Sequence, residues 1–197
     1  MGHGLGVAPN TVIIKTRSAT NNWVVYHQST GTSKYLHLST TDAATTASNY
    51  FADDSGNGPS STVFYGRNDG NTSSQTMIAY CLSEVAGFSK FGSYTGNGDA
   101  DGTFVYTGFR VAWLMVKSTA SGHHWLIRDN KRNPNNVVTK GLYANEADSE
   151  IDTSSRYADF YANGFKPRGT HGQQNTSSQE YFYFAFAESP FKNSRAR

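Results

Sequence analysis

The chain has 197 residues, of which 37% are hydrophobic and 16% charged, and its 12 Tyr, 12 Phe and 3 Trp are enough to fill a core. The formal net charge is +2, and basic residues are scattered apart from Lys192, Arg195 and Arg197, which argues against a nucleic acid partner. The amino terminus lacks the charged and apolar regions of a secretion signal, and no run approaches the ~18 apolar residues of a membrane span. We therefore expect a folded, soluble protein made in the cytoplasm.

Gly, Ser, Thr and Asn are abundant and separate short runs of β-branched and aromatic residues, which is typical of an all-β fold. In chain order, the expected strands are "TVIIKT" (11–16), "NWVVYH" (22–27), "KYLHL" (34–38), "TVFYG" (62–66), "TMIAYCL" (76–82), "AWLMVK" (112–117), "HWLIRD" (124–129), "YADFYA" (157–162), "FKPRG" (165–169) and "EYFYFAFA" (180–187). The last run is too continuously hydrophobic to face water on one side. It should therefore lie centrally in a sheet with both faces covered.

The pentapeptide "NTSSQ" occurs twice, at 71–75 and at 175–179. At the same offset, Glu84 corresponds to Glu188 at the end of the strand that follows. In both places the pentapeptide reads as a polar turn that enters a hydrophobic strand, where Asn and Ser side chains bond nearby backbone groups. The two glutamates are expected to have equivalent structural roles.

Further segments repeat in the same order. "GLGVA" aligns with "GFRVA", "VIIK" with "LMVK", and Trp23 with Trp125. Such agreement at both ends and in the middle predicts an internal duplication. We expect one β-sandwich repeat at 1–94 and another at 95–197, either as two sandwiches or with their strands pooled in one. The segment from Phe88 that joins the repeats is expected to be a short connection with turns.

The motifs "HGLGVAP", "NWVVYH", "FSKFGSYTGNGDADGTFVYTGFR", "WLIRDNKRNPNNV", "NGFKPRG" and "YFYFAFAESPFK" closely resemble a repeated module of structural proteins from tailed bacteriophages, particularly marine ones. That module is regarded as a laminin-G-like, concanavalin A-like β-sandwich. The resemblance implies two antiparallel sheets packed face to face with jelly-roll connections. Similar modules have a Gly-rich strand ahead of "HGLG", so either a neighbouring subunit supplies it here or the edge is short and protected.

The same resemblance implies a protein of the virion exterior, either tail-associated or capsid-decorating. Its expected partners are other virion proteins and copies of itself. The lectin-like fold adds a host surface polysaccharide as a further partner, and a dedicated receptor-binding lectin is the alternative function. No enzyme activity and no required cofactor are expected.

The stretch from His123 to Asn136 is the most site-like part of the sequence, because an aromatic ring near clustered polar groups is typical of sugar recognition. The candidate glycan-binding residues are Trp125, Asp129, Arg132, Asn133 and Asn136. The alternative is structural: Trp125 aligns with Trp23 as a core residue, Asp129 and Arg132 form a pair, and Asn133 begins a turn.

Two acidic patterns suggest further chemistry. "EADSE", from Glu146 to Glu150, resembles the Glu-x-Asp-x-Glu run of laminarinase-type glycoside hydrolases, in which alternation places the carboxylates on one face of a strand. Here the context reads as a loop, so hydrolysis is the weaker alternative.

"NGDADG" places oxygen-bearing side chains at Asn97, Asp99 and Asp101, as at the start of a calcium loop. Gly108 stands where a helix-loop-helix site needs its bidentate Glu, which leaves a looser calcium site or a solvated turn. The histidines lack zinc-binding spacing, and Cys81 is the single cysteine, so it forms no intrachain disulfide.

Overall fold

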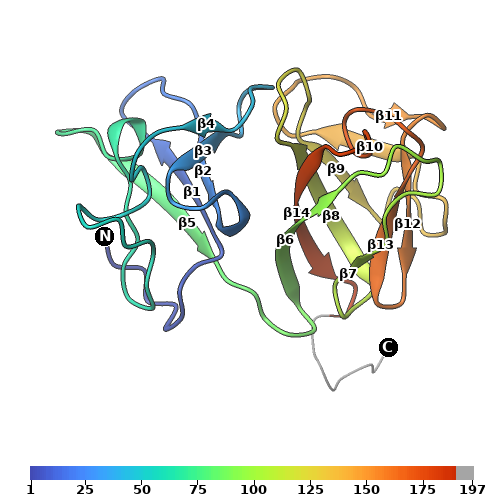
Figure 1. The fold of residues 1–197 in the computed structure, drawn as a ribbon, viewed down its shortest axis with the longest axis horizontal. Coiled ribbons are helices and arrows are strands. Elements are labelled where there is room, and N and C mark those ends of the chain that lie inside the picture. Colours follow the sequence, from blue (N-terminus) through green and yellow to red (C-terminus); the bar gives the residue numbers. More distant parts are fainter. Residues whose placement is uncertain (190–197) are drawn as a thin grey trace. The chain divides into compact units, whose positions relative to one another are not determined.

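The computed structural model describes residues 1–189, and these residues form antiparallel strands without an α-helix (Figure 1). None of the helical turns in this range is long and apolar enough to cross a membrane. The chain divides into two compact units, Met1–Glu84 and Val85–Arg197. The basic tail residues Lys192, Arg195 and Arg197 lie outside the described residues.

The strands are β1 (Thr11–Thr16), β2 (Val24–His27), β3 (Lys34–His37), β4 (Thr45–Thr46), β5 (Met77–Leu82), β6 (Ser89–Thr95), β7 (Val105–Tyr106), β8 (Val111–Ser118), β9 (Leu126–Asp129), β10 (Lys140–Tyr143), β11 (Ile151–Asp152), β12 (Tyr157–Tyr161), β13 (Gly164–Arg168) and β14 (Glu180–Ala187). Two 3₁₀ turns, η1 (Gln28–Thr30) and η2 (Asn68–Gly70), complete the described elements. The all-β expectation is confirmed.

The first unit contains one five-stranded sheet with the order β4-β3-β2-β1-β5. Val12 and Ile14 of β1 are buried in its core, which the irregular segment between β4 and β5 completes with Tyr50, Phe51 and Phe64. The expected strand at 62–66 is wrong: there, only an isolated bridge joins Val63 to Gly2. Phe64 of that run is buried in the core, while the backbone of the run does not join the sheet.

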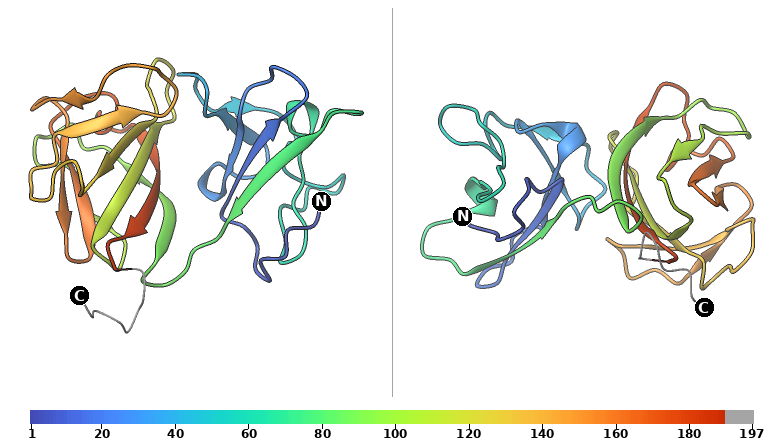
Figure 2. Two further views of the ribbon diagram at one scale, coloured as in Figure 1. Left: turned by 180° about the vertical axis from the view of Figure 1, so that it is seen from behind. Right: turned by 90° about the horizontal axis from the view of Figure 1, so that it is seen from below.

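The second unit contains a six-stranded sheet, β11-β10-β9-β8-β14-β6, and a three-stranded sheet, β12-β13-β7 (Figure 2). Both sheets contribute side chains to one core cluster, with Val116 and Tyr183 from the larger sheet and Phe160 and Phe165 from the smaller. Side chains alternate between the two faces of a strand, so one face of each sheet lines this core. The opposite face of the smaller sheet carries the side chains that alternate with these core residues along β12 and β13.

The position of β14 matches the sequence. This strand lies between β8 and β6, and Tyr181, Phe182, Tyr183, Phe184 and Ala185 are all buried. Burial on both faces explains why the run is continuously hydrophobic.

The segment from Phe88 differs from the expected turn-rich connection. It forms β6, which pairs with β14 from Ser89–Phe186 to Thr95–Glu180 and therefore belongs to the second unit. The unit boundary lies between Glu84 and Val85, ahead of the expected boundary after residue 94. Gly and Ser within "SKFGSYT" have low strand propensity, so the sequence alone did not reveal this strand.

The two larger sheets share a strand order. In the first unit β1 lies between β2 and β5, and in the second β8 lies between β9 and β14. Ile14 pairs with Val24 and Ala79, whereas Val116 pairs with Leu126 and Tyr183. The equivalent residues of β1 and β8, and of β2 and β9, differ by 102 in number, and those of β5 and β14 differ by 104. These are the two offsets found when the halves of the sequence are aligned.

Candidate functional site

The outward face of the three-stranded sheet presents a row of aromatic and charged side chains. On β12, "YADFY" alternates so that Ala158 and Phe160 point into the core while Tyr157, Asp159 and Tyr161 point outward. The neighbouring β13 and β7 place Lys166, Arg168 and Tyr106 on the same side. We call the set Phe104, Tyr106, Tyr157, Asp159, Tyr161, Lys166 and Arg168 the aromatic face.

The aromatic rings of this face are accessible. Tyr106 is 62% exposed, Phe104 44% and Tyr161 37%. The rings of Phe104 and Tyr161 meet edge to face with centroids 5.8 Å apart. Exposed aromatic rings gathered on a rigid sheet are a common feature of binding surfaces.

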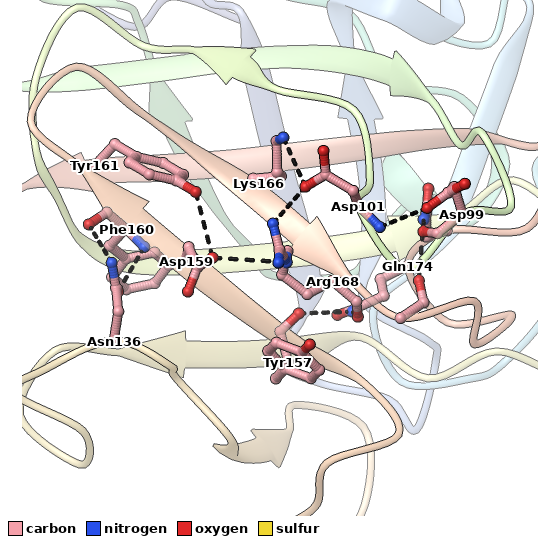
Figure 3. A network of polar contacts seen from close by, with 12 residues as sticks. Asp99, Asp101, Asn136, Tyr157, Asp159, Phe160, Tyr161, Lys166, Arg168 and Gln174 are labelled. Carbon is pink, nitrogen blue, oxygen red and sulfur yellow. Dashed lines mark hydrogen bonds and ion pairs between the residues drawn. The ribbon is translucent and has the colours of Figure 1, made fainter.

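Charged groups are fixed among the rings (Figure 3). Arg168 lies between two carboxylates: it pairs with Asp101, and its Nε is 3.6 Å from Asp159 Oδ2. Tyr161 donates its hydroxyl to Asp159 Oδ2 at 3.3 Å, and Lys166 Nζ lies 2.9 Å from Asp101 Oδ1. A hydrogen bond to Tyr157, followed by the nearby carboxylates, raises the pKa of Arg168, so this side chain stays a cation. The face therefore offers fixed donors and acceptors beside apolar rings.

A close approach of strands positions the face. A Cβ added at Gly164 would lie 2.2 Å from the carbonyl oxygen of Val105, so only glycine allows β13 to lie this near β7. The core side of the sheet is anchored by Phe165, which is fully buried. Gly164 pairs in register with Tyr106 on one side and with Tyr161 on the other, so β7 adds Tyr106 to this face from a distant part of the sequence.

The three candidate calcium residues do not act as one group. Asn97 Oδ1 accepts from the amide of Asp99, and Asp99 Oδ1 accepts from the amide of Asp101, as in consecutive Asx turns. Asp101 points toward Lys166 and Arg168, and the hydrogen bond from Lys166 lowers the pKa of its carboxyl. Residues 1–189 contain no cluster of three or more His, Cys, Asp or Glu side chains that could hold a metal ion.

Asn175, the first residue of the second "NTSSQ", holds this loop. It is 0% exposed, and its amide nitrogen donates to Asn97 Oδ1, to the Asp99 carbonyl and to the Gly169 carbonyl at 2.7 to 3.0 Å. Its Oδ1 accepts from the amide of Asn97 at 3.0 Å. The pentapeptide thus holds the loop that carries Asp101, and Asp101 contacts Lys166 and Arg168 of the aromatic face.

The candidate glycan residues around Trp125 have structural contacts. Trp125 is 0% exposed and packs against Phe184 with centroids 6.0 Å apart. Asp129 accepts from the amides of Lys131 and Arg132 and also pairs with the Arg132 side chain. A ring without exposed surface offers no face for stacking on a sugar, and these contacts are those of the structural alternative.

The two candidate asparagines also bond to the backbone. Asn133 Oδ1 accepts from the amide of Lys140 at 2.8 Å, which closes the loop between β9 and β10. Asn136 both donates to the carbonyl of Phe160 and accepts from its amide, so it attaches this loop to β12. The structure therefore does not bring the five candidates together as an open site.

The "EADSE" carboxylates face different partners. Residues 145–150 lie outside the strands, and β11 begins at Ile151. Glu146 Oε1 is 3.5 Å from His124, whereas Glu150 is 2.8 Å from Arg132 and 3.4 Å from Lys140. The strand alternation that would align a nucleophile and an acid is absent from this segment.

Sequence reasoning overlooked the aromatic face, although part of its signal was present. The alternation in "YADFYA" and "FKPRG" already separates Tyr157, Asp159 and Tyr161 from the core residues, and likewise Lys166 and Arg168. What the sequence does not show is that the second of these strands, β13, pairs with β7 and so brings Tyr106 to the same face of the sheet.

The described residues define an all-β domain of antiparallel sheets with an exposed aromatic and charged face. Residues 1–190 match the family model described as a domain of unknown function, DUF7483, and the chain belongs to that family. The match spans both units, so the family is defined over both of them together. Comparisons with curated proteins and with solved structures found no match.

Proposed function

We propose that this protein is a non-catalytic component of a bacteriophage particle and that its second unit binds carbohydrate through the aromatic face. The observation that supports binding at this face is the gathering of exposed Tyr106, Phe104 and Tyr161 beside the fixed charges of Asp159 and Arg168. Aromatic rings pack against the apolar faces of sugar rings, and charged planar groups bond hydroxyl pairs. The phage origin rests on the sequence motifs that resemble virion modules.

The finer description of the fold belongs to the same proposal. We infer that the second unit is a lectin-like β-sandwich of jelly-roll type, because its two sheets contribute to one core and the smaller sheet has an exposed outer face. The sugar would then lie across a rigid sheet, where little side-chain entropy is lost on binding.

We also infer that the two units arose by internal duplication. The shared strand order and the agreement of strand register with the sequence offsets support this inference. A shift of one residue in a strand would move all of its side chains to the opposite face of the sheet. Equivalent residues pair with each other in both units, which is therefore evidence for a common origin.

Binding without catalysis is supported by the environment of the acidic residues. Glu146 and Glu150 have separate partners, and Asp101 and Asp159 are paired with cations. A general acid needs a raised pKa, which a neighbouring cation opposes.

A glycan array and host polysaccharides test the proposal on the purified chain. Saturable binding should be lost in Tyr106→Ala with no change in melting temperature, because this ring is exposed. Tyr80→Ala, which removes an exposed tyrosine of β5 in the first unit, is the matched control and should leave binding intact. Binding of neutral glycans that survives Tyr106→Ala and Tyr161→Ala together would exclude the aromatic face.

The particle assignment needs a separate test. An antibody raised against the chain should label purified phage particles, on the tail or on the capsid. A chain absent from purified particles would refute the virion role. Labelled particles whose protein binds no glycan would instead assign the aromatic face to contact with neighbouring subunits.

A further inference from the structure

A second group of aromatic and basic side chains lies where loops of the second unit meet. His124 precedes β9, Tyr143 ends β10, Arg156 precedes β12 and His171 follows β13. All four are half-buried. We call these four residues the loop cluster; none of them belongs to the aromatic face.

Tyr143 lies at the centre of the loop cluster. Its ring stacks on that of His124 with centroids 4.4 Å apart and planes at 24°. The guanidinium carbon of Arg156 is 5.9 Å from the Tyr143 ring centroid, and Arg156 Nη2 donates to the Tyr143 hydroxyl at 2.6 Å. Arg156 Nη1 lies 2.9 Å from His171 Nε2. The phenol and the imidazole thus orient the guanidinium without neutralising it.

The positive charges of the two arginines in this region are not balanced by ion pairs among the described residues. Within residues 1–189, no carboxylate is ion-paired with Arg156 or with Arg128, which is buried behind it. Arg128 donates to the carbonyls of Val138 and Arg156 and to Gln174 Oε1. Glu146 lies 3.5 Å from His124 instead. Because two positively charged arginines lie close together, binding of an anion near them lowers their mutual repulsion.

The guanidinium of Arg156 has donors to spare. Its Nε is buried without a hydrogen-bond partner, and Nη1 and Nη2 each have more N–H groups than the contacts with His171 and Tyr143 use. A planar carboxylate matches such a fork of donors.

His171 gives an independent sign of a missing acceptor. Arg156 Nη1 approaches its Nε2, and the amide of Gln173 approaches its Nδ1 at 3.2 Å. A neutral imidazole has one acceptor nitrogen, so one of these two donors lacks an acceptor. Burial, and then the charges of Arg156, His123 and Arg128, lowers the pKa of His171, as expected in a region of positive potential.

We propose that the loop cluster binds the carboxylate of an acidic sugar residue, with Arg156 holding the carboxylate and the stacked Tyr143 and His124 rings supporting the sugar. This proposal rests on carbohydrate binding as the function but places a second, charge-selective subsite outside the aromatic face. The ligand class is a uronic-acid-type polysaccharide.

Calorimetric titration of the full chain with oligogalacturonate tests the proposal, with uncharged oligogalactose as the neutral counterpart. Arg156→Gln should weaken oligogalacturonate binding about tenfold or more, the loss of one charge-assisted contact. Arg156→Lys should weaken it less, because the charge remains while the fork is lost. Arg17→Gln, which removes the same charge from an exposed position of the first unit, should change nothing.

Protonation offers a second readout. His171 faces Arg156, His123, Arg128 and the Gln173 amide, so its protonation adds a positive charge and removes an acceptor from Arg156. Oligogalacturonate binding should therefore strengthen as pH falls below about 6.5, and His171→Gln should flatten this dependence.

The outcomes separate the two sites. Unchanged oligogalacturonate affinity in folded Arg156→Gln protein, or neutral sugar binding without any binding of the acidic oligomer, overturns the subsite while leaving the aromatic face. If Arg156→Gln melts at a lower temperature than the unmodified chain, Tyr143→Phe keeps the ring and removes the hydroxyl that holds Arg156. Unchanged oligogalacturonate affinity in that variant also overturns the subsite.

Sulfated galactan bound as well as oligogalacturonate would contradict a carboxylate-specific fork. Loss of neutral binding alone, in Tyr106→Ala, identifies the aromatic face.

Discussion

Asn71 and Asn175 begin the same pentapeptide, yet they have different roles in the two units. Asn71 is exposed and ends the 3₁₀ turn η2 through its backbone amide. Asn175 is buried and bonds Asn97, Asp99 and Gly169 with its side chain. The same pentapeptide therefore precedes a strand in both units, while its surroundings decide whether the first side chain is exposed or buried.

The difference follows from how each core is covered. In the first unit, irregular chain containing Tyr50, Phe51 and Phe64 covers the sheet. In the second, a three-stranded sheet does so, and its loops must be fixed to the larger sheet. Buried polar groups in such loops need partners, which Asn175 supplies.

The tryptophans give the largest contrast. Trp125→Ala should lower the free energy of unfolding of the second unit by about 3–5 kcal/mol, because a fully buried ring leaves a cavity. Trp23→Ala, at the aligned half-buried position, should cost the first unit about 1–2 kcal/mol. Denaturant unfolding followed by circular dichroism measures both, and equal losses would contradict the difference in burial.

The pentapeptides give the next contrast. Asn175→Ala should destabilise the second unit by about 2–3 kcal/mol, since the amide of Asn97 and the carbonyls of Asp99 and Gly169 lose a partner. Asn71→Ala should cost less than about 0.5 kcal/mol. A thermal melt of the two variants side by side decides, and a large loss in Asn71→Ala would show that the turns are equivalent after all.

A smaller effect is expected from pH. Burial, followed by nearby cations, lowers the pKa values of His123 and His171 below 6.5 in the folded chain. As pH falls through 6.5 the unfolded state takes up these protons first, so stability declines between 6.5 and the lowered folded values. The melting temperature of the second unit should fall in this window. His171→Gln should reduce the slope, and an unchanged slope in that variant would assign the dependence to other groups.

Calcium is expected to have the smallest effect. Asp101 is held by Lys166 and Arg168, and Asn97 and Asp99 each accept a hydrogen bond from a backbone amide of the same loop. Addition of calcium, or of a chelator, should leave both melting transitions unchanged. A rise in the melting temperature with calcium that disappears in Asp101→Asn would restore a calcium site at this loop.

Several strands could be read from the sequence because their signals are local. The bounds of β1 and β14 were predicted correctly at 11–16 and 180–187, and the central position of β14 followed from its continuous hydrophobicity. The run "TVFYG" was misread, because hydrophobic residues of an irregular core segment look like those of a strand.

Neither candidate surface could be located in this way. Tyr106 pairs with Gly164, and Arg156 lies beside Tyr143 and His171, only because loops and strands distant in the chain come together. The stretch around Trp125 was predicted as a binding site because the sequence does not show whether an aromatic residue is exposed or buried. In the structure Trp125 is buried.

Composition, alternation and turn residues were sufficient for the all-β class, most strands and the repeated order of segments, because these depend on near neighbours in the chain. Strand pairing between distant segments, the burial of Trp125 and Asn175, and the assembly of the aromatic face and the loop cluster required the folded structure. Each of these depends on contacts whose partners are many residues apart, and the pattern of one segment does not specify which distant segment will cover it.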